Sequence, residues 1–362
     1  MRKDITKSDA LFSMKQLGRK GFFVLILLLF IILGNGYSHD SKSQGYPVPW
    51  KFAVISDTQG EKSTMAFYPG INEPIIRAIA RDIAAERPDF VLVAGDLVNG
   101  WIWNNNTSFA TQYANWRSAM EPVYSAGIHV FPIRGNHDVG PERVVLPPLP
   151  ARLEPAPGAL ALLEKTFKES FKEPYIPLNG PKGEEGFTFS FSHKNAFIVG
   201  LDVCGSRQHK VDQGWLNRQL AGNRNPHVFV YAHEPAFQVR HRDCLAFYKE
   251  DRDTFWDTLG KNGSRVYFCG HDHLYNRAVI ADLAGNEIRQ IVVGTGGGRL
   301  VQWSGTYGEN TRIKGEYSNS GYHGYILVTI DGLKATVVWK ALVMQGKENT
   351  WRVLDSFSYT LP

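Results

Sequence analysis

Five short apolar segments of this chain each run directly into a cluster of polar residues, and this pattern constrains the fold more than any other feature. In parallel sheets of α/β proteins, ligands bind at the carboxyl ends of the strands, so we expect the five clusters to meet at one site. The clusters are Asp57-Thr58-Gln59, Gly95-Asp96-Leu97-Val98-Asn99, Arg134-Gly135-Asn136-His137-Asp138, Ala232-His233-Glu234-Pro235 and Gly270-His271-Asp272-His273.

The segments between these clusters predict helices alternating with strands, which indicates an α/β fold. Strands are expected over residues 51–56, 90–94, 128–133, 187–191, 196–201, 227–231 and 265–269. Helices are expected over 73–87, 110–126, 160–171, 213–221 and 252–262, whereas the proline-rich stretch 139–157 is expected to form an irregular loop. Beyond Arg277 only strand-like runs remain, over 288–293, 325–330, 335–342 and 351–358, and they are expected to complete a second sheet.

The N-terminal residues have a different character. Residues 22–33 form an unbroken run of 12 apolar residues after Arg19 and Lys20. This is short for a membrane-spanning helix but typical of a secretory signal, with cleavage after Ser38 and Met14 as a possible true start. We therefore expect a signal peptide over 1–38, a polar linker over 39–48, and export to the periplasm or the extracellular space. The alternative is an uncleaved leader that anchors the chain in a membrane.

The net charge of +5 belongs mostly to this leader, because residues 1–38 carry six basic and two acidic side chains. The remaining 34 basic and 33 acidic side chains nearly cancel, so specific binding of long nucleic acid is not expected. The three cysteines are too few for a disulfide framework. Cys204 and Cys244 are candidates for one pair, and Cys269 is expected to be a buried thiol.

Each polar cluster alone has a common structural explanation, such as a turn or a helix cap. The His271 and His273 pair is more informative, because side chains two residues apart in an extended segment point the same way. All five clusters in this order favour a metal site over separate structural roles.

The order of the clusters resembles that of the calcineurin-like metallophosphoesterases, with the motifs D-x-H, G-D-x-x-[DN], G-N-H-[DE], a lone His and G-H-x-H. The resemblance extends from about residue 50 to 330, and four of the five motifs match as written. It implies a single catalytic domain over 49–362, with a four-layer αββα sandwich of two mixed sheets flanked by helices.

The resemblance also implies two divalent metal ions with mixed nitrogen and oxygen ligands, a donor set that suits Mn, Fe or Zn. Gln59 stands where most relatives have His, so a weaker, neutral amide ligand is expected there. One ion would be held by Asp57, Gln59, Asp96 and His273, and the other by Asn136, His233, His271 and the shared Asp96.

The remaining site residues are assigned from the same resemblance. His137 is expected to be the general acid, oriented by the side chain of Asn99 or by Asp138. Arg134 is expected either to clamp the substrate phosphate or to form a surface ion pair. Further pocket candidates are Trp101, Trp103, His241, Tyr307 and His323.

The predicted function is hydrolysis of a small phosphorylated substrate through in-line attack by a metal-bridging hydroxide. One alternative is a phosphodiesterase or pyrophosphatase acting on a nucleotide or a phospholipid headgroup. The other is a metal-stabilised surface protein that binds a partner without catalysis. Membrane contact is expected only through an uncleaved leader.

Overall fold

A computed structural model describes residues 48–61, 69–100, 108–140, 159–309, 311–345 and 348–362. The predicted leader and nearly all of the predicted linker lie outside the described residues. No helix within the described ranges is long and apolar enough to cross a membrane.

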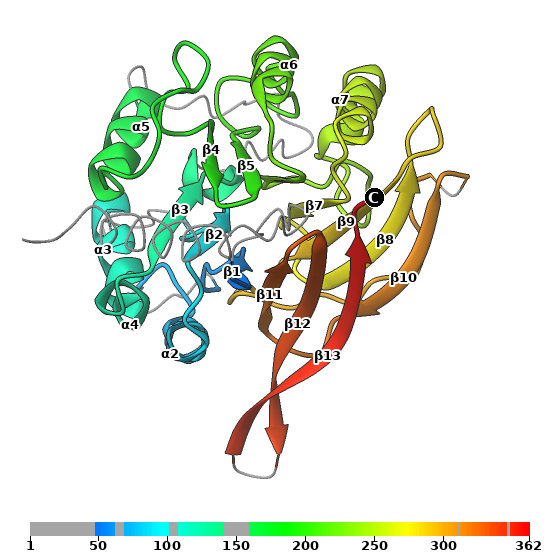
Figure 1. The fold of residues 1–362 in the computed structure, drawn as a ribbon. Coiled ribbons are helices and arrows are strands. Elements are labelled where there is room, and N and C mark those ends of the chain that lie inside the picture. The colour runs from blue at the N-terminus through cyan, green and yellow to red at the C-terminus, as the bar shows by residue number, and fades with distance from the viewer. Residues whose placement is uncertain (1–47, 62–68, 101–107, 141–158, 310, 346–347) are drawn as a thin grey trace, which may run out of the picture. The chain divides into compact units, whose positions relative to one another are not determined.

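The described residues form two mixed β-sheets flanked by helices, as expected for the four-layer sandwich (Figure 1). The first sheet has the order β13-β12-β11-β1-β2-β3. Its strands are β1 (Trp50–Ile55), β2 (Phe90–Ala94), β3 (His129–Ile133), β11 (Gly324–Asp331), β12 (Lys334–Gln345) and β13 (Glu348–Thr360). Strands β1 to β3 run parallel, and β11 to β13 are added antiparallel beside β1.

The second sheet has the order β10-β8-β9-β7-β6-β5-β4. In it β5, β6, β7 and β9 run parallel, and β4, β8 and β10 are antiparallel to their neighbours. Its strands are β4 (Phe189–His193), β5 (Ala196–Leu201), β6 (His227–Ala232), β7 (Val266–Cys269), β8 (Tyr275–Ala281), β9 (Glu287–Val293) and β10 (Ile313–Asn319).

The late strands correct one expectation, because they do not all belong to the second sheet. Strands β11, β12 and β13 join the first sheet, and only β8, β9 and β10 extend the second. Strands β8 and β10 were also missing from the sequence prediction. The remaining predicted strands are present, with shifts of a few residues at their ends.

The helices are α2 (Glu73–Glu86), α3 (Phe109–Ala119), α4 (Glu121–Ser125), α5 (Ala159–Ser170), α6 (Gln213–Gly222) and α7 (Lys249–Lys261). Helix α2 buries Ile76, Ile79 and Ile83 on one face, which is the expected helical spacing. The single helix expected over 110–126 is instead the pair α3 and α4, which meet at Met120. Pro122 lies in the first turn of α4, where its missing N–H is tolerated, but it cannot continue a helix from α3.

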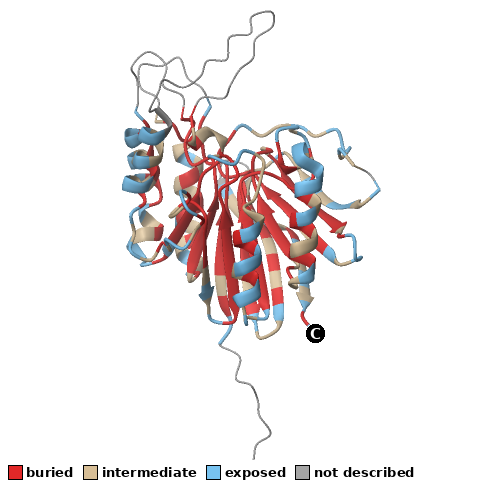
Figure 2. Cartoon of the chain, turned by 90° about the horizontal axis from the view of Figure 1, so that it is seen from above, coloured by how far each residue is buried: buried red, intermediate tan, exposed pale blue. Residues whose placement is uncertain are grey.

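The two sheets pack face to face through aromatic side chains. The ring of Phe52 on β1 lies 5.0 Å from that of Phe229 on β6 and 6.3 Å from that of Phe268 on β7, measured between centroids. Figure 2 shows that the strands are mostly buried and that the helices expose their outer faces. This rigid core fixes the strand ends that carry the polar clusters.

Candidate metal centre

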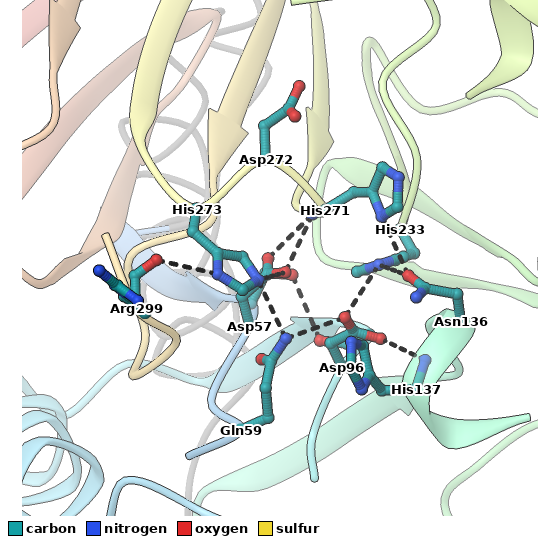
Figure 3. Close-up of polar contacts among 12 residues, drawn as sticks. Asp57, Gln59, Asp96, Asn136, His137, His233, His271, Asp272, His273 and Arg299 are labelled. Carbon is teal, nitrogen blue, oxygen red and sulfur yellow. Dashed lines mark hydrogen bonds and ion pairs between the residues drawn. The ribbon is translucent and has the colours of Figure 1, made fainter. Parts of the chain in front are cut away.

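The five polar clusters converge at the carboxyl ends of β1, β2 and β3 in the first sheet and of β6 and β7 in the second (Figure 3). Three of the residues that enter the site have left-handed backbone conformations, namely Asp57 (φ 56°), Asp96 (φ 52°) and His271 (φ 70°). Non-glycine residues adopt this conformation rarely and at some cost, and such strain is concentrated at functional sites. The turns therefore hold these side chains where the strands end.

Asp96 connects the two halves of the cluster. Its Oδ1 accepts a hydrogen bond from the backbone N–H of His137 at 2.9 Å, and its Oδ2 lies 3.0 Å from Gln59 Nε2 and 3.4 Å from His233 Nε2. Ligand atoms of Asp57, Asp96 and His233 all lie within 4.8 Å of one another, a spacing that suits a shared metal ion. Asp96 is thus placed where the bridging ligand was predicted.

Two of the predicted histidine ligands are oriented by backbone carbonyls. Nδ1 of His233 lies 2.9 Å from the carbonyl of Ala94, and Nδ1 of His273 lies 3.1 Å from the carbonyl of Arg299. A carbonyl can only accept, so each Nδ1 carries a hydrogen, and Nε2 is the nitrogen that faces the cluster. These rings are therefore held in the orientation that metal binding through Nε2 requires.

Asn136 and His271 form the other side of the cluster. Asn136 Oδ1 lies 2.9 Å from His233 Nε2 and 2.9 Å from His271 Nδ1. His271 differs from the other histidines, because its Nδ1 faces the cluster and its Nε2 lies 3.5 Å from Asp243. The backbone N–H of His271 donates to both carboxylate oxygens of Asp57 and so fixes that side chain.

The hydrogen bonds of the Gln59 amide indicate whether the side chains around it could bind a cation. Its Nε2 lies 3.0 Å from Asp96 Oδ2 and 3.0 Å from His273 Nε2, while its buried Oε1 has no hydrogen-bond partner. The oxygen and nitrogen of an amide are assigned by their surroundings and can be exchanged by a half turn. After that turn Oε1 would face Asp96 Oδ2 and His273 Nε2, which carry lone pairs of their own. Such a contact is favourable only if a cation lies between the three atoms. The residues present therefore fit a metal ion, and Gln59 is placed where it could bind one.

The electrostatics of the protein alone agree with this interpretation. Burial disfavours the charged form of Asp96, but the neighbouring His233 and His137 outweigh it and lower its pKa. Burial likewise opposes protonation of His233, yet Asp96 raises the pKa of that imidazole to about 10. A buried carboxylate of this kind needs a positive partner, which either an imidazolium or a metal ion supplies.

His137 lies in the short 3₁₀ helix η1 (Asn136–Asp138) and lines the cavity above the cluster. Its Nδ1 lies 2.7 Å from the backbone carbonyl of Asn99, so the orienting group is the main chain and not the Asn99 side chain. The Asn99 Nδ2 donates instead to the carbonyl of Gly60 at 2.9 Å. The predicted contact through the Asn99 side chain is therefore replaced by one through the Asn99 main chain.

Asp138 does not orient His137. Its buried carboxylate accepts hydrogen bonds from the backbone N–H of Gly135 at 2.9 Å and of Leu97 at 3.2 Å. Burial and the adjacent Asp96 raise the pKa of Asp138 to about 7, against these two donors. Asp138 therefore closes the turns that carry Asp96 and Asn136.

Arg134 is placed differently from the predicted phosphate clamp. Its side chain is 1% exposed and forms a buried ion pair with Asp202 through Nε and Nη2. Its guanidinium also lies 3.4 Å from Glu164 and stacks 3.6 Å from the ring centroid of Phe187. Asp202 raises its pKa against the effect of burial. The predicted surface ion pair is likewise wrong, because the pair is in the interior.

A cavity of about 280 Å³ opens over the cluster. Among the other pocket candidates only His241 lines it, while His323 bonds the carbonyl of Thr295 and Tyr307 lines a neighbouring cavity. Trp101 and Trp103 lie outside the described residues. The cavity is lined by Asp96, Asn136, His137, Arg240, His241, His271, His273, Arg299 and Val301.

Sequence reasoning missed Arg240 and Arg299, the two guanidinium groups of this cavity. The basic stretch Arg240-His241-Arg242, not far beyond the lone His233, was the available signal. The pairing of Cys204 with Cys244 is wrong, because both are free and buried, and Cys269 is a buried thiol as expected.

Comparisons with known proteins place this geometry in a family. The family described as calcineurin-like phosphoesterase matches residues 51–275. No curated protein sequence matches the chain significantly. Among solved structures, purple acid phosphatase PPD1 of yellow lupin (Lupinus luteus) has a TM-score of 0.61 at 16% identity, over 86% of this chain and 54% of that chain.

Two further structures share the fold. PhoD has a TM-score of 0.61 at 15% identity, over 88% of this chain and 70% of that chain. GAP50, the anchor in the inner membrane complex of Plasmodium, has a TM-score of 0.52 at 16% identity, over 87% and 89%. At these identities the likeness shows the fold alone, and this chain spans about half the length of the lupin phosphatase. With the family match covering more than half of its residues, the chain belongs to the calcineurin-like phosphoesterases.

Proposed function

We propose that this chain hydrolyses a phosphoester bond of a small phosphorylated molecule at the cluster between β1, β2, β3, β6 and β7. The observation that carries the proposal is the convergence of seven side chains, with imidazole nitrogens, amide groups and carboxylates around one centre. The seven are Asp57, Gln59, Asp96, Asn136, His233, His271 and His273 (Figure 3).

Asp57, Gln59, Asp96 and His273 would hold one divalent ion, and Asn136, His233, His271 and Asp96 the second. A pair of such ions lowers the pKa of water and offsets the charge of a phosphoryl group. Imidazole, amide and carboxylate ligands together favour Mn, Fe or Zn.

His137 supplies the proton for the leaving oxygen in this proposal. The carbonyl of Asn99 accepts the hydrogen of Nδ1, which leaves Nε2 to carry the transferable proton. The backbone N–H of His137 is bonded to Asp96, so the acid is tied to the cluster it serves. A general acid matters most when the leaving group is a poor one.

Arg240 and Arg299 take the role first expected of Arg134. Both line the cavity beside His271 and His273. A guanidinium offers several N–H donors in one plane and can bind two phosphate oxygens. The substrate phosphate would thus meet positive charge at the rim of the cavity as well as at its floor.

The test compares His137→Ala with Asn99→Ala in manganese-loaded protein. We expect His137→Ala to keep its metal content and to lose about 100-fold or more in kcat on an alkyl phosphate, with a smaller loss on nitrophenyl phosphate. Asn99→Ala keeps the carbonyl that orients His137, so its loss on the alkyl phosphate should be much smaller. Equal losses of the His137 variant on both substrates would contradict its assignment as the acid.

A further inference from the structure

A second cavity, of about 450 Å³, adjoins the one over the metal cluster. Arg240 lines both, and the two chain segments 238–242 and 299–308 supply walls to each. Its volume falls in the range typical of sites for small molecules, and the proposed mechanism has not used it. A substrate whose phosphoryl group lies at the metals would extend into this space.

The aromatic part of the wall is held in place before any ligand binds. The rings of Trp303 and Tyr307 lie 4.7 Å apart at an angle of 61°. Trp303 Nε1 donates to the carbonyl of Val239 at 2.9 Å, and the hydroxyl of Tyr307 accepts from Asn276 Nδ2 at 3.0 Å. Because the two partly exposed rings are inclined to each other, they form a fixed corner, in which a planar ligand can stack on one ring and meet the other at its edge at little entropic cost.

The charged part of the wall is positive. Arg240 and Arg242 both line the cavity, and among the residues that the structure describes no carboxylate forms an ion pair with either guanidinium. Arg240 instead contacts the imidazole of its neighbour His241 at 2.7 Å. The polar side chains of Gln238, Gln302, Ser304 and Thr306 complete the lining. This combination fits a ligand that has a flat ring with polar edges and a negative charge.

We propose that this second cavity receives the leaving group of the substrate, and that the leaving group has the chemistry of a nucleotide. This inference rests on the proposed hydrolysis at the metal cluster, and the bond cleaved would be the phosphoanhydride between the two phosphates of the substrate. The ring would stack on Trp303, with Tyr307 against its edge, and a second phosphate would be bound by Arg242. In the reaction the bond between the terminal phosphorus of a nucleoside diphosphate and its bridging oxygen breaks, the oxygen of water bonds to that phosphorus, and the proton that the water loses passes to solvent. His137 donates the proton to the departing nucleoside monophosphate.

Four substrates separate the ring from the charge. Adenosine 5′-diphosphate has a leaving group with both features, adenosine 5′-monophosphate has the ring alone, pyrophosphate has the charge alone, and glycerol phosphate has neither. We expect kcat/KM of the manganese-loaded full chain to be highest for the diphosphate. Trp303→Leu should lower the ratio of the diphosphate to pyrophosphate about tenfold, because a stacked base is lost.

Arg242→Gln should lower the ratio of the diphosphate to the monophosphate about tenfold, because a charge-assisted hydrogen bond is lost. Arg242 is exposed, so this variant keeps the inference testable if Trp303→Leu does not fold. Matched controls are Arg218→Gln on α6 and Trp351→Leu on β13, which line neither cavity and should leave both ratios unchanged.

Equilibrium binding of adenosine 5′-diphosphate to chelator-treated protein gives a readout apart from turnover. If Trp303→Leu and Arg242→Gln each weaken this binding, the result supports the second cavity as a nucleotide site. If no substrate is hydrolysed at the same time, only the proposed function is overturned. Hydrolysis of glycerol phosphate as fast as the diphosphate, with both ratios unchanged in the two variants, would overturn the nucleotide inference and leave the proposed function intact.

Discussion

Arg134 and Asp202 show how much a single buried pair contributes at the edge of the site. Each side chain is 1% exposed, so both charges have left water and depend on one another. Removing one partner of such a pair leaves the other as an uncompensated buried charge, which typically costs about 3–5 kcal/mol. Arg134 directly precedes the Gly135 to Asp138 turn, so its ion pair with Asp202 fixes the start of that turn.

Arg134→Met should therefore lower the free energy of unfolding by about 3–5 kcal/mol. The KM of the folded fraction for a phosphate monoester should hardly change, because the guanidinium does not reach the cavity. Chemical denaturation and steady-state kinetics measure the two effects. Arg240→Met is the matched comparison, with an expected rise in KM and a stability change of about 0.5 kcal/mol or less. A rise in KM for Arg134→Met without a loss of stability, and the reverse for Arg240→Met, would show that Arg134 is the phosphate clamp after all.

The sequence was sufficient for the residue types of the site but not for all of their contacts. The order of motifs identified all seven candidate ligands and His137 because each follows a strand whose apolar run is unmistakable. It did not show that a main-chain carbonyl of Asn99 orients His137, because every residue has such a carbonyl. The sequence also did not show that Arg134 is buried, because its partner Asp202 lies 68 positions away, directly after β5 of the other sheet.

At the scale of elements, glycines allow the strand ends to approach one another closely. A Cβ on Gly270, which follows β7, would lie 2.0 Å from Ser56 Oγ and 2.1 Å from Asp57 Oδ2. A Cβ on Gly135, which follows β3 by two residues, would lie 2.2 Å from Asp96 Oδ1. These contacts are far shorter than atoms tolerate, so glycine is required where β7 of one sheet meets β1 of the other, and where the turn after β3 meets the turn after β2.

Gly270→Ala should displace Asp57 and lower the metal content of purified protein from two ions toward one per chain, with a loss of about 1–3 kcal/mol in stability from overpacking. Gly222→Ala at the end of α6 is the control, because a Cβ there meets nothing within 4 Å. Elemental analysis and thermal unfolding measure the two quantities. A fully metallated Gly270 variant would show that Asp57 is dispensable for metal binding.

The elements that the sequence predicted well are those with a single clear pattern. Parallel strands buried on both faces appear as continuous apolar runs, and α2 has a helical stripe between Pro74 and Pro88. Strand β8 was missed because it buries Asn276 and Arg277, which have partners in Tyr307 and Asp355. Strand β10 was missed because it is a mostly exposed edge strand without apolar alternation.

At the scale of the whole molecule, the candidate metal site lies between the two sheets, since its proposed ligands follow strands of both. Removal of the ions with a chelator should therefore lower the melting temperature of the entire domain, not only the activity. Saturation at about 100 times Kd adds about 2.7 kcal/mol for each site, so re-addition of Mn should raise Tm by several degrees in a concentration-dependent way. Asp96→Asn should show little of this rise. A melting temperature independent of Mn would contradict a metal site that joins the sheets.

The pairing of β1 with β11 has a consequence for how the protein is made. Trp50 pairs with Ile330 and Val54 with Ile326. One edge of β1 can therefore be paired only after a strand from near the other end of the chain has been synthesised. During synthesis β2 and β3 can add to one side of β1, while its other edge stays open to misassociation. Such long-range closure makes folding slow. A nascent chain that ends before Gly324 already contains all the proposed ligands, from Asp57 to His273. It still lacks β11, so it cannot complete the sheet whose strand β1 leads into Asp57.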